Sequence, residues 1–450
     1  MNRPAAGAEG GRTADSAPST GRDGVAIRSV DVLVVGAGPA GLAAAARLAA
    51  AGVGRVEVLE RDEEAGGAPR HCDHGGFGAG ERGRTVDGPA FARRSLALAL
   101  RAGAVVRTGV TVTGWAGPLA LEVTAPTGLE RIAARAVVLA TGARERPRSA
   151  RLVPGTRPAG ILTTGELQRS VVLHGVRGPR LGRRAVVIGA EPVAVHAVRT
   201  LREAGLDVVA RVTDRPPGRR RLTAASGGAT PPLLTGATVT EILGRGRLTG
   251  VGVAYDDGRR GTVRCDTAVF TGDWIPEHEL ARTGGVPLDP ATRGPAVDGS
   301  FRTATTGVFA AGDVLRGVES AATAAAEGRA AAEAVLRRLA GEPWSTGGVP
   351  VVAESPLRWV LPHRIAGPLP NRTPDGSDRR AGDGAATRPV LVRAETSLES
   401  PVFRVVQDGR LLHRVAVRGA VAPWRSVRLS PAWTRDVDPE GGPVVVGVGG

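Results

Sequence analysis

The chain has 450 residues, of which 42% are hydrophobic, and its formal net charge at pH 7 is +15. This length predicts two to four domains, since a domain commonly holds about 100–200 residues. The two cysteines are too few for a disulfide framework, an iron–sulfur cluster or a multi-cysteine zinc site. The sequence contains no lysine, and its short arginine clusters lack interleaved aromatic residues, which argues against nucleic-acid binding.

The N-terminal segment is rich in Gly, Ala, Ser and Asp without periodicity, and this predicts a disordered tail over residues 1–28. The segment has no apolar stretch typical of a secretory signal. No charge-free apolar run in the chain reaches the ~18 residues of a membrane span. We therefore expect a cytoplasmic protein with no membrane span.

A strand–turn–helix–strand unit follows the tail. Val30–Val35 is an apolar run typical of a buried parallel strand, Leu42–Ala51 predicts an alanine-rich helix, and Arg55–Leu59 predicts a second strand. The turn between the first strand and the helix reads Gly-Ala-Gly-Pro-Ala-Gly over residues 36–41. This arrangement is the usual setting of a dinucleotide-binding glycine motif.

Each glycine of this motif has a physical role. Gly36 allows a tight turn, Gly38 lets the backbone approach a pyrophosphate, and Gly41 lets the helix pack closely on the strand. Glu60 follows the second strand, 24 positions after Gly36, where its carboxylate can accept hydrogen bonds from a ribose diol. The glycines and the acid together predict a bound dinucleotide.

The next segment begins with a glycine-rich, irregular stretch over residues 61–88 and continues with a predicted helix over Ala90–Ala102. Alternating apolar residues then predict three strands. These strands are Val105–Val112, Leu119–Val123 and Ile132–Leu139, the last of which ends at Ala140-Thr141-Gly142.

The first unit recurs about 150 residues later. We expect a strand at Ala185–Ile188, a turn at Gly189–Ala194, a helix through Val198–Ala204 and a strand at Leu206–Val212. A side chain, Glu191, stands where the backbone should approach a pyrophosphate, and its size and charge oppose phosphate binding.

Two alternatives for this second unit stay open on the sequence alone. It could bind NAD(P)H in a modified mode, or it could be a retained but empty nucleotide domain. If it binds, Arg211, Arg215 and Arg219 near the end of the second strand could favour a 2′-phosphate.

After the second unit, strands are expected through Val253, at Ala268–Thr271 and at Gly307–Ala311, before a helix from about Glu319 to Leu339. The character of the sequence changes after Gly341. A polar Gly/Pro stretch over residues 366–388 predicts a linker or long loop, and residues 389–450 look all-β. The strongest hairpin signal is Asp408-Gly409 between Val402–Val406 and Leu411–Val415.

Four segments carry a resemblance to a known family. They are Asp31–Gly41, Glu60, Ala140–Gly142 and Thr306–Asp313. Over roughly residues 30–340 the chain resembles the pyridine nucleotide–disulfide oxidoreductase superfamily of flavoproteins.

The resemblance implies an α/β fold with two Rossmann-like three-layer dinucleotide-binding domains, the FAD domain split in sequence, and a small β-rich C-terminal domain. The implied order is a tail (1–28), the first segment of the FAD-binding domain (29–148), a degenerate second dinucleotide-binding domain (149–286), the second segment of the FAD-binding domain (287–342), and a β-rich region (343–450) containing the flexible loop 366–388.

The same resemblance implies FAD as the cofactor. Asp313 takes the role of the acid that bonds the ribityl or pyrophosphate region, and the helix after it directs its positive end at the flavin pyrimidine oxygen. The expected cofactor contacts are Gly36, Ala37, Gly38, Pro39, Ala40, Gly41, Glu60, Arg61, Gly67, Val110, Ala140, Thr141, Gly142, Gly312 and Asp313, with Gly189 in the second unit.

Disulfide reductases of this family carry two redox cysteines in a CxxC or CxxxxC spacing, whereas Cys72 and Cys265 are 193 positions apart. Dithiol–disulfide cycling is therefore not expected. A narrower resemblance comes from residues 66–78, Ala140–Arg148 and Thr163–Gln168. These segments resemble the FAD-containing alpha-type subunits of heteromeric amine and amino-acid oxidases, such as those of sarcosine oxidase, opine oxidase and hydrogen cyanide synthase.

Three residues are candidates for catalysis. Cys72 and His74 lie in a polar loop expected to face the flavin, and His278 follows the second nucleotide unit as a candidate general acid or base. His71, Cys72 and His74 lack a second ligand group, so we expect no metal site.

The sequence thus predicts an FAD-dependent oxidoreductase that moves a hydride or electron pair through its flavin. The other redox terminal is NAD(P)H or an amine- or amino-acid-oxidising partner subunit, with a small-molecule substrate. Two alternatives are direct amine oxidation on the chain's own flavin, and a non-catalytic FAD-binding assembly subunit of a heteromeric amine or amino-acid dehydrogenase.

Overall fold

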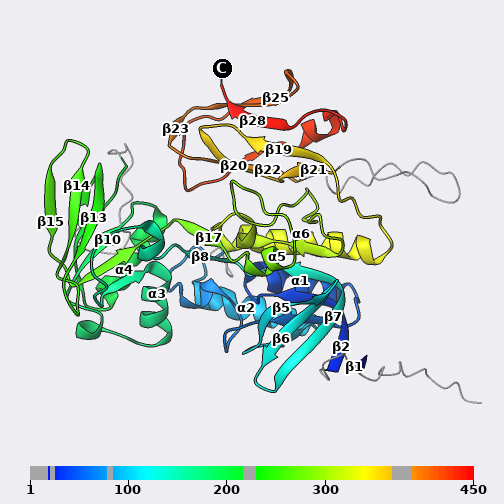
Figure 1. The fold of residues 1–450 in the computed structure, drawn as a ribbon, viewed down its shortest axis with the longest axis horizontal. Helices are drawn as coiled ribbons and strands as arrows, with labels where there is room; N and C mark the ends of the chain where they lie inside the picture. The colour runs from blue at the N-terminus through cyan, green and yellow to red at the C-terminus, as the bar shows by residue number, and fades with distance from the viewer. Residues whose placement is uncertain (1–18, 21–25, 79–84, 216–229, 367–387, 450) are drawn as a thin grey trace, which may run out of the picture.

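A computed structural model describes residues 19–20, 26–78, 85–215, 230–366 and 388–449. Two nucleotide-binding-type α/β domains lie side by side, and a β-rich C-terminal domain covers the first of them (Figure 1). The observed architecture is therefore the α/β arrangement predicted from the sequence. None of the described helices is long and apolar enough to cross a membrane.

The first domain is built on an eight-stranded sheet with the order β4-β3-β2-β7-β6-β5, to which β1 adds beside β2 and β18 beside β7. Strands β2, β3, β4, β7 and β18 run parallel, whereas β5 and β6 form an antiparallel extension. The strands are β1 (Ser19–Thr20), β2 (Ala26–Val35), β3 (Val56–Leu59), β4 (Val105–Arg107), β5 (Thr111–Gly117), β6 (Ala120–Ala125), β7 (Gly128–Leu139) and β18 (Val308–Ala310). Because β18 comes from far along the chain, this domain is split in sequence.

The described helices that pack on this sheet include α1 (Pro39–Ala50), α2 (Gly88–Arg101) and α6 (Ala321–Leu339). Helices α1 and α6 approach each other very closely. A Cβ on Gly328 of α6 would lie 2.0 Å from the carbonyl oxygen of Ala40 in α1. A glycine is thus required where the two helices meet.

The N-terminal strand is longer than predicted. β2 begins at Ala26 and pairs with β7 from Ile27 onward. An ion pair explains the extension, because the Arg28 guanidinium binds Glu57 at 2.7 Å and Glu130 at 3.1 Å on the neighbouring strands. Most of the predicted tail over residues 1–28 lies outside the described residues.

The predicted strand Val105–Val112 is two strands, β4 and β5. Gly109 has a φ of +66°, and the Val110 N–H donates to the Glu60 carbonyl at 2.8 Å. The chain therefore leaves the sheet at this point, which brings Val110 beside Glu60.

The second domain contains a five-stranded parallel sheet with the order β12-β11-β10-β16-β9, together with the antiparallel meander β13-β14-β15. The strands are β9 (Ile161–Thr163), β10 (Arg184–Ile188), β11 (Asp207–Val212), β12 (Leu233–Leu234), β13 (Ala237–Leu243), β14 (Gly250–Tyr255), β15 (Arg260–Val263) and β16 (Thr267–Phe270), and the helices are α3 (Thr164–Gln168) and α4 (Pro192–Glu203). Strands β8 (Ala143–Glu145) and β17 (Trp274–Pro276) pair antiparallel, link the two domains and precede α5 (Glu279–Thr283).

The C-terminal domain has sheets ordered β21-β19-β28-β24-β25, β20-β22-β27 and β23-β26. Its strands are β19 (Val349–Ala353), β20 (Leu357–Leu361), β21 (Arg364–Ile365), β22 (Val390–Ala394), β23 (Leu398–Glu399), β24 (Val402–Gln407), β25 (Arg410–Ala416), β26 (Ala420–Val421), β27 (Val427–Leu429) and β28 (Val444–Val448). The predicted hairpin is present, with φ values of +49° at Asp408 and +80° at Gly409. The predicted loop 366–388 lies almost wholly outside the described residues.

Charged and aromatic contacts attach the C-terminal domain to the first domain near the start of α6. Arg393 of β22 forms an ion pair with Glu319, and its guanidinium lies 5.0 Å from the centre of the Trp359 ring. Arg316 contacts the same ring at 5.6 Å and binds the Glu327 carboxylate at 2.6 Å. Because these groups are largely buried, the C-terminal domain has a fixed position over α6.

Candidate functional site

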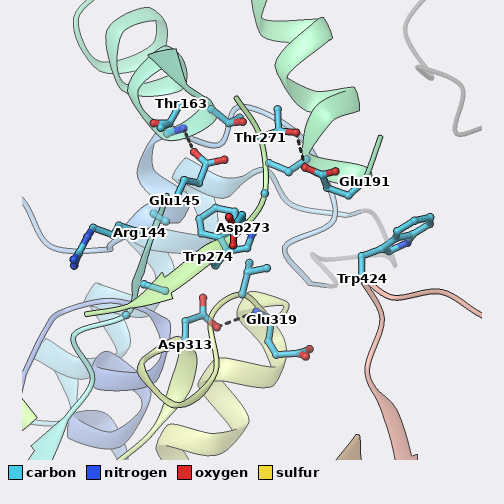
Figure 2. A pocket seen from close by; sticks show the side chains of 18 of the residues that line it. Arg144, Glu145, Thr163, Glu191, Thr271, Asp273, Trp274, Asp313, Glu319 and Trp424 are labelled. Atoms are coloured by element: carbon cyan, nitrogen blue, oxygen red, sulfur yellow. Dashed lines mark hydrogen bonds between the residues drawn. The ribbon is translucent and has the colours of Figure 1, made fainter. Parts of the chain in front are cut away.

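A cleft of ≈ 2260 Å³ runs between the three domains. Its walls are formed by the turn before α1, the segment after β7, the start of α4, the start of α6 and a C-terminal loop that carries Trp424 (Figure 2). The parallel strands of both nucleotide-binding-type domains point their carboxyl ends toward such a crevice, which is where α/β sheets bind ligands.

The glycine motif has the geometry of a phosphate-binding turn. Gly36 has a φ of +102°, and a Cβ there would lie 2.4 Å from the Ala140 carbonyl oxygen. A Cβ on Gly41 would lie 1.9 Å from the Gly36 carbonyl oxygen. By contrast, no atom of the described residues lies within 4 Å of a Cβ placed on Gly38, which lines the cleft and caps α1. Gly36 and Gly41 thus serve the fold, while Gly38 leaves room for a ligand.

Glu60 is held at the edge of the cleft. Its carboxylate accepts the Ala37 N–H at 2.9 Å and the Asp62 N–H at 3.0 Å. Arg61 also lines the cleft, and its side chain lies 3.7 Å from the Glu277 carboxylate. The Glu60 carboxylate is therefore oriented beside the glycine turn before any ligand binds.

Asp313 lies in the short helical turn η6 (Gly312–Leu315), across the cleft from Glu145 (Figure 2). Its carboxylate accepts the Glu319 N–H at 3.0 Å. Burial raises the pKa of Asp313 to about 7, although the Arg316 guanidinium opposes the rise. The neighbouring Gly312 is needed for packing, since a Cβ there would lie 2.7 Å from the Ala40 Cβ.

Not every expected cofactor contact faces the cleft. The expected contacts that line it are Gly36, Gly38, Pro39, Ala40, Glu60, Arg61, Gly67, Val110, Ala140, Thr141, Gly142, Gly189 and Asp313. Ala37, Gly41 and Gly312 are not among the described lining residues. They support the turn through their backbone and packing.

The open space at Gly38, the N-terminus of α1 and the carboxylates of Glu60 and Asp313 fit FAD. A helix N-terminus offers free N–H groups and a positive dipole to a pyrophosphate. A carboxylate at the end of the second strand suits a ribose diol. The residues that would hold the cofactor are therefore arranged for it.

The polar loop expected to face the flavin places Cys72 in the cleft but leaves its thiol protonated. Burial raises the pKa of Cys72 to about 12, and the nearby Glu145 carboxylate adds to the rise. The Sγ atom lies 3.6 Å from the Gln168 side-chain oxygen. A thiol this weakly acidic is a poor nucleophile at neutral pH. Cys265 is buried, and both cysteines are free.

His74 reaches the second domain. Its ring stacks on that of His196 in α4, with the ring centres 3.5 Å apart. Burial lowers the pKa of both histidines, that of His196 to about 4. His278 instead precedes α5 and is not among the described residues that line the cleft. In the described ranges of the chain, no three His, Cys, Asp or Glu side chains are grouped to hold a metal ion.

Glu145, which was not among the site residues predicted from the sequence, lies on β8 where the two domains meet. The side chain is 7% exposed and lines the cleft. One carboxylate oxygen accepts the Gly165 N–H at 2.7 Å, and the other has no hydrogen-bond partner among the described residues. Burial raises the pKa of Glu145 to about 7. An acid with one unpartnered oxygen and such a pKa is suited to exchange protons near neutral pH.

Replacing Glu145 with glutamine is expected to remove a pH dependence of stability. The pKa of Glu145 is about 7 in the fold against a usual 4.5, so the proton is held more tightly in the fold. Protonated Glu145 therefore contributes fully to the free energy of unfolding below about pH 4.5. This contribution, about 3 kcal/mol, is lost as the pH rises through 7. Denaturant unfolding of wild type and Glu145→Gln from pH 4.5 to 8.5 measures the difference. Glu64→Gln, whose side chain is 75% exposed, is the control, and parallel curves for wild type and Glu145→Gln would contradict the assignment.

The arginines expected to favour a 2′-phosphate do not form one site. Arg211 is 3% exposed and is not among the described residues that line the cleft. Arg215 lines the cleft, but its guanidinium stacks on the Trp424 ring at 5.5 Å. Arg219 lies outside the described residues. Burial of Arg211 thus makes the expectation for that residue wrong.

Comparison with known proteins gives a consistent result. Residues 30–328 match the family described as pyridine nucleotide-disulphide oxidoreductase. The chain is 28% identical to the sarcosine oxidase alpha subunit of Rhizobium meliloti (strain 1021), over 69% of this chain and 30% of that protein. It is 28% identical to one of the opine oxidase subunits of Agrobacterium tumefaciens (strain Ach5), over 69% of this chain and 66% of that protein. The chain thus spans less than two thirds of either relative.

Among solved structures, T. acidophilum thioredoxin reductase is similar with a TM-score of 0.57 and 24% identity, over 70% of this chain and all of that chain. At this identity the likeness concerns the fold. The family match covers both nucleotide-binding-type domains, and the cleft between them has the groups that FAD requires. The chain belongs to the pyridine nucleotide-disulphide oxidoreductase family, and it is an FAD-dependent oxidoreductase.

Proposed function

We propose that this chain is the FAD-carrying subunit of a heteromeric amine or amino-acid oxidase or dehydrogenase. One combination of features supports this most. Gly38, Glu60 and Asp313 form a cradle that fits FAD, while half-buried Cys72 and buried Cys265 are both free. Without a redox disulfide, the electron pair must be exchanged with another molecule. Relatives named as subunits of sarcosine oxidase and opine oxidase favour an amine-oxidising partner.

In this proposal, different residues hold different parts of the cofactor. The turn at Gly38 and the N-terminus of α1 bind the pyrophosphate, and Glu60 orients the adjacent ribose. Asp313 and the start of α6 hold the other half of the molecule. When bound, FAD supplies the capacity to accept and release a hydride or an electron pair.

Glu145 is the proton-exchanging residue in this proposal. Its unpartnered oxygen is buried in the wall of the cleft, and its pKa of about 7 lets it take up or release a proton at neutral pH. Cys72 lies beside it as a protonated thiol, and His74 fixes the loop against α4. Of the other residues that the sequence suggested for catalysis, Cys72 has a pKa of about 12 and His278 is not among the described residues that line the cleft.

The test compares the isolated chain with the complex that a tagged copy brings from its native cells. Both are loaded with FAD and titrated anaerobically with sarcosine and with octopine, while the visible flavin absorbance is followed. We expect bleaching in the complex and not in the isolated chain, with dithionite bleaching both as a control. Bleaching of the isolated chain would instead make it an independent amine oxidase. A complex whose flavin stays oxidised with both amines would contradict the proposal.

A further inference from the structure

The two nucleotide units of this chain are built on the same backbone. The Gly36 N–H donates to the Leu59 carbonyl at 2.8 Å, and the Gly189 N–H donates to the Val212 carbonyl at 2.8 Å. The two turns read GAGPAG and GAEPVA, so Gly38 in the first turn corresponds to Glu191 in the second.

These two corresponding residues also share a conformation. Gly38 has φ −79° and ψ −174°, Glu191 has φ −71° and ψ 169°, and each caps a helix of 12 residues that begins with proline. The chain therefore presents the same turn twice, once open and once carrying a carboxylate.

The Glu191 carboxylate folds back over its own turn. It accepts the Ala190 N–H at 3.0 Å and the Thr271 hydroxyl at 2.5 Å, as Figure 2 shows for Thr271. A Cβ on Gly272 would lie 2.5 Å from a carboxylate oxygen of Glu191. The carboxylate thus lies between the turn and the segment that leads to β17.

In the first unit, the corresponding N–H of Ala37 also binds a carboxylate, but a distant one, that of Glu60. That arrangement leaves the space at Gly38 free. By the backbone correspondence, the residue in the place of Glu60 is Thr213, which is 6% exposed and cannot accept from a ribose diol as a carboxylate does. The second unit has therefore lost the ribose acid and gained an acid at the pyrophosphate position.

A pyrophosphate at this turn would meet both the bulk and the negative charge of Glu191. The positive end of α4 attracts an anion, and the Glu191 carboxylate already supplies one there. Farther along the cleft, the Trp424 ring of the C-terminal domain stacks on Arg215, two residues beyond Thr213. A nicotinamide dinucleotide therefore does not fit the second unit.

We propose that Glu191 is an internal anion that closes the second nucleotide site, so that neither NADH nor NADPH serves this chain, and that it anchors α4 to Thr271 instead. The inference concerns nucleotide binding and stands apart from the proposed amine-oxidising partner. A failure of one can thus be told from a failure of the other, because binding is measured without any amine.

The test replaces Glu191 with glycine, the residue at the corresponding position of the first turn. Glu191→Gly gives the sequence GAGPVA, which matches the first turn at the positions that face a phosphate. Binding of NADH and NADPH is followed by calorimetry on the FAD-loaded chain, and flavin bleaching is followed in the same samples. We expect no binding at 1 mM nucleotide in wild type and at least a tenfold gain in affinity in Glu191→Gly, a change of about 1.4 kcal/mol.

Three further variants separate the effects of the charge of Glu191, the size of its side chain and the aromatic contact of Trp424. Glu203→Gln removes one negative charge from the other end of α4 and should leave binding at the wild-type level. Glu191→Gln keeps the size of the side chain and should recover less affinity than the glycine. The double variant Glu191→Gly, Trp424→Ala removes the aromatic contact as well. A wild-type dissociation constant below 1 mM for NADH or NADPH would overturn the proposal. So would the absence of any gain in affinity in both variants that carry Glu191→Gly.

Discussion

Replacing Gly38 with glutamate is expected to abolish FAD retention while the chain stays folded. The reason is that the fold itself leaves this position free. Among the described residues no atom lies within 4 Å of a Cβ on Gly38, and the backbone there is close to that of Glu191, which already carries the same side chain. The new carboxylate would occupy the space and oppose the charge of a pyrophosphate at the start of α1.

The measurement is the ratio of flavin to protein after reconstitution with FAD, together with the unfolding midpoint of the apo-protein. We expect at least a 100-fold loss of FAD affinity and an unchanged midpoint. Gly347→Glu adds the same charge at an exposed glycine that also has open space around it, and it should keep its flavin. A Gly38→Glu protein with full flavin content would show that the pyrophosphate does not bind at this turn.

Gly41→Ala provides the contrasting outcome. A Cβ at Gly41 would lie 1.9 Å from the Gly36 carbonyl oxygen, with or without a cofactor. This variant should therefore lose stability in the apo-protein, whereas Gly38→Glu should not. The pair separates the glycine that serves the ligand from the glycine that serves the fold.

Local patterns predicted the fold and the cradle because each depends on neighbours in sequence. The glycine turn before α1, the acid after β3 and the Asp408-Gly409 hairpin are all set within a few residues, or within one βαβ unit. The start of β2 was predicted too late because the Arg28 charge is satisfied by Glu57 and Glu130 on other strands. That pairing cannot be inferred from the hydrophobic pattern alone.

The features of the site that the sequence did not predict depend on long-range packing. Glu145 has its unusual pKa because β8 and β17 bury it between two domains. The contact between Trp424 and Arg215 joins residues from different domains. A charge such as Glu191 could be recognised as unfavourable for phosphate, but its hydrogen bond to Thr271 needed the fold.

The second large effect is expected at Asp313. Its carboxyl is buried beside Arg316, Glu327 and Glu319, and its pKa is about 7. Removing the side chain in Asp313→Ala takes away the proposed polar partner of the cofactor and an acceptor for the Glu319 N–H. We therefore expect at least a tenfold loss of FAD affinity, measured by equilibrium dialysis of the reconstituted protein.

The pH dependence of FAD affinity distinguishes binding from a merely structural role of Asp313. When neutral, the carboxyl can donate a hydrogen bond and does not repel the cofactor phosphates; when ionised, it cannot donate and it repels them. Wild-type affinity should therefore fall as the pH rises through about 7, while Asp313→Asn, which stays neutral, should remain flat. Asp207→Asn, with an exposed side chain, should follow the wild type. An Asp313→Ala protein that retains full flavin would contradict the assignment, because this variant lacks every polar atom of the side chain that is proposed to contact the cofactor.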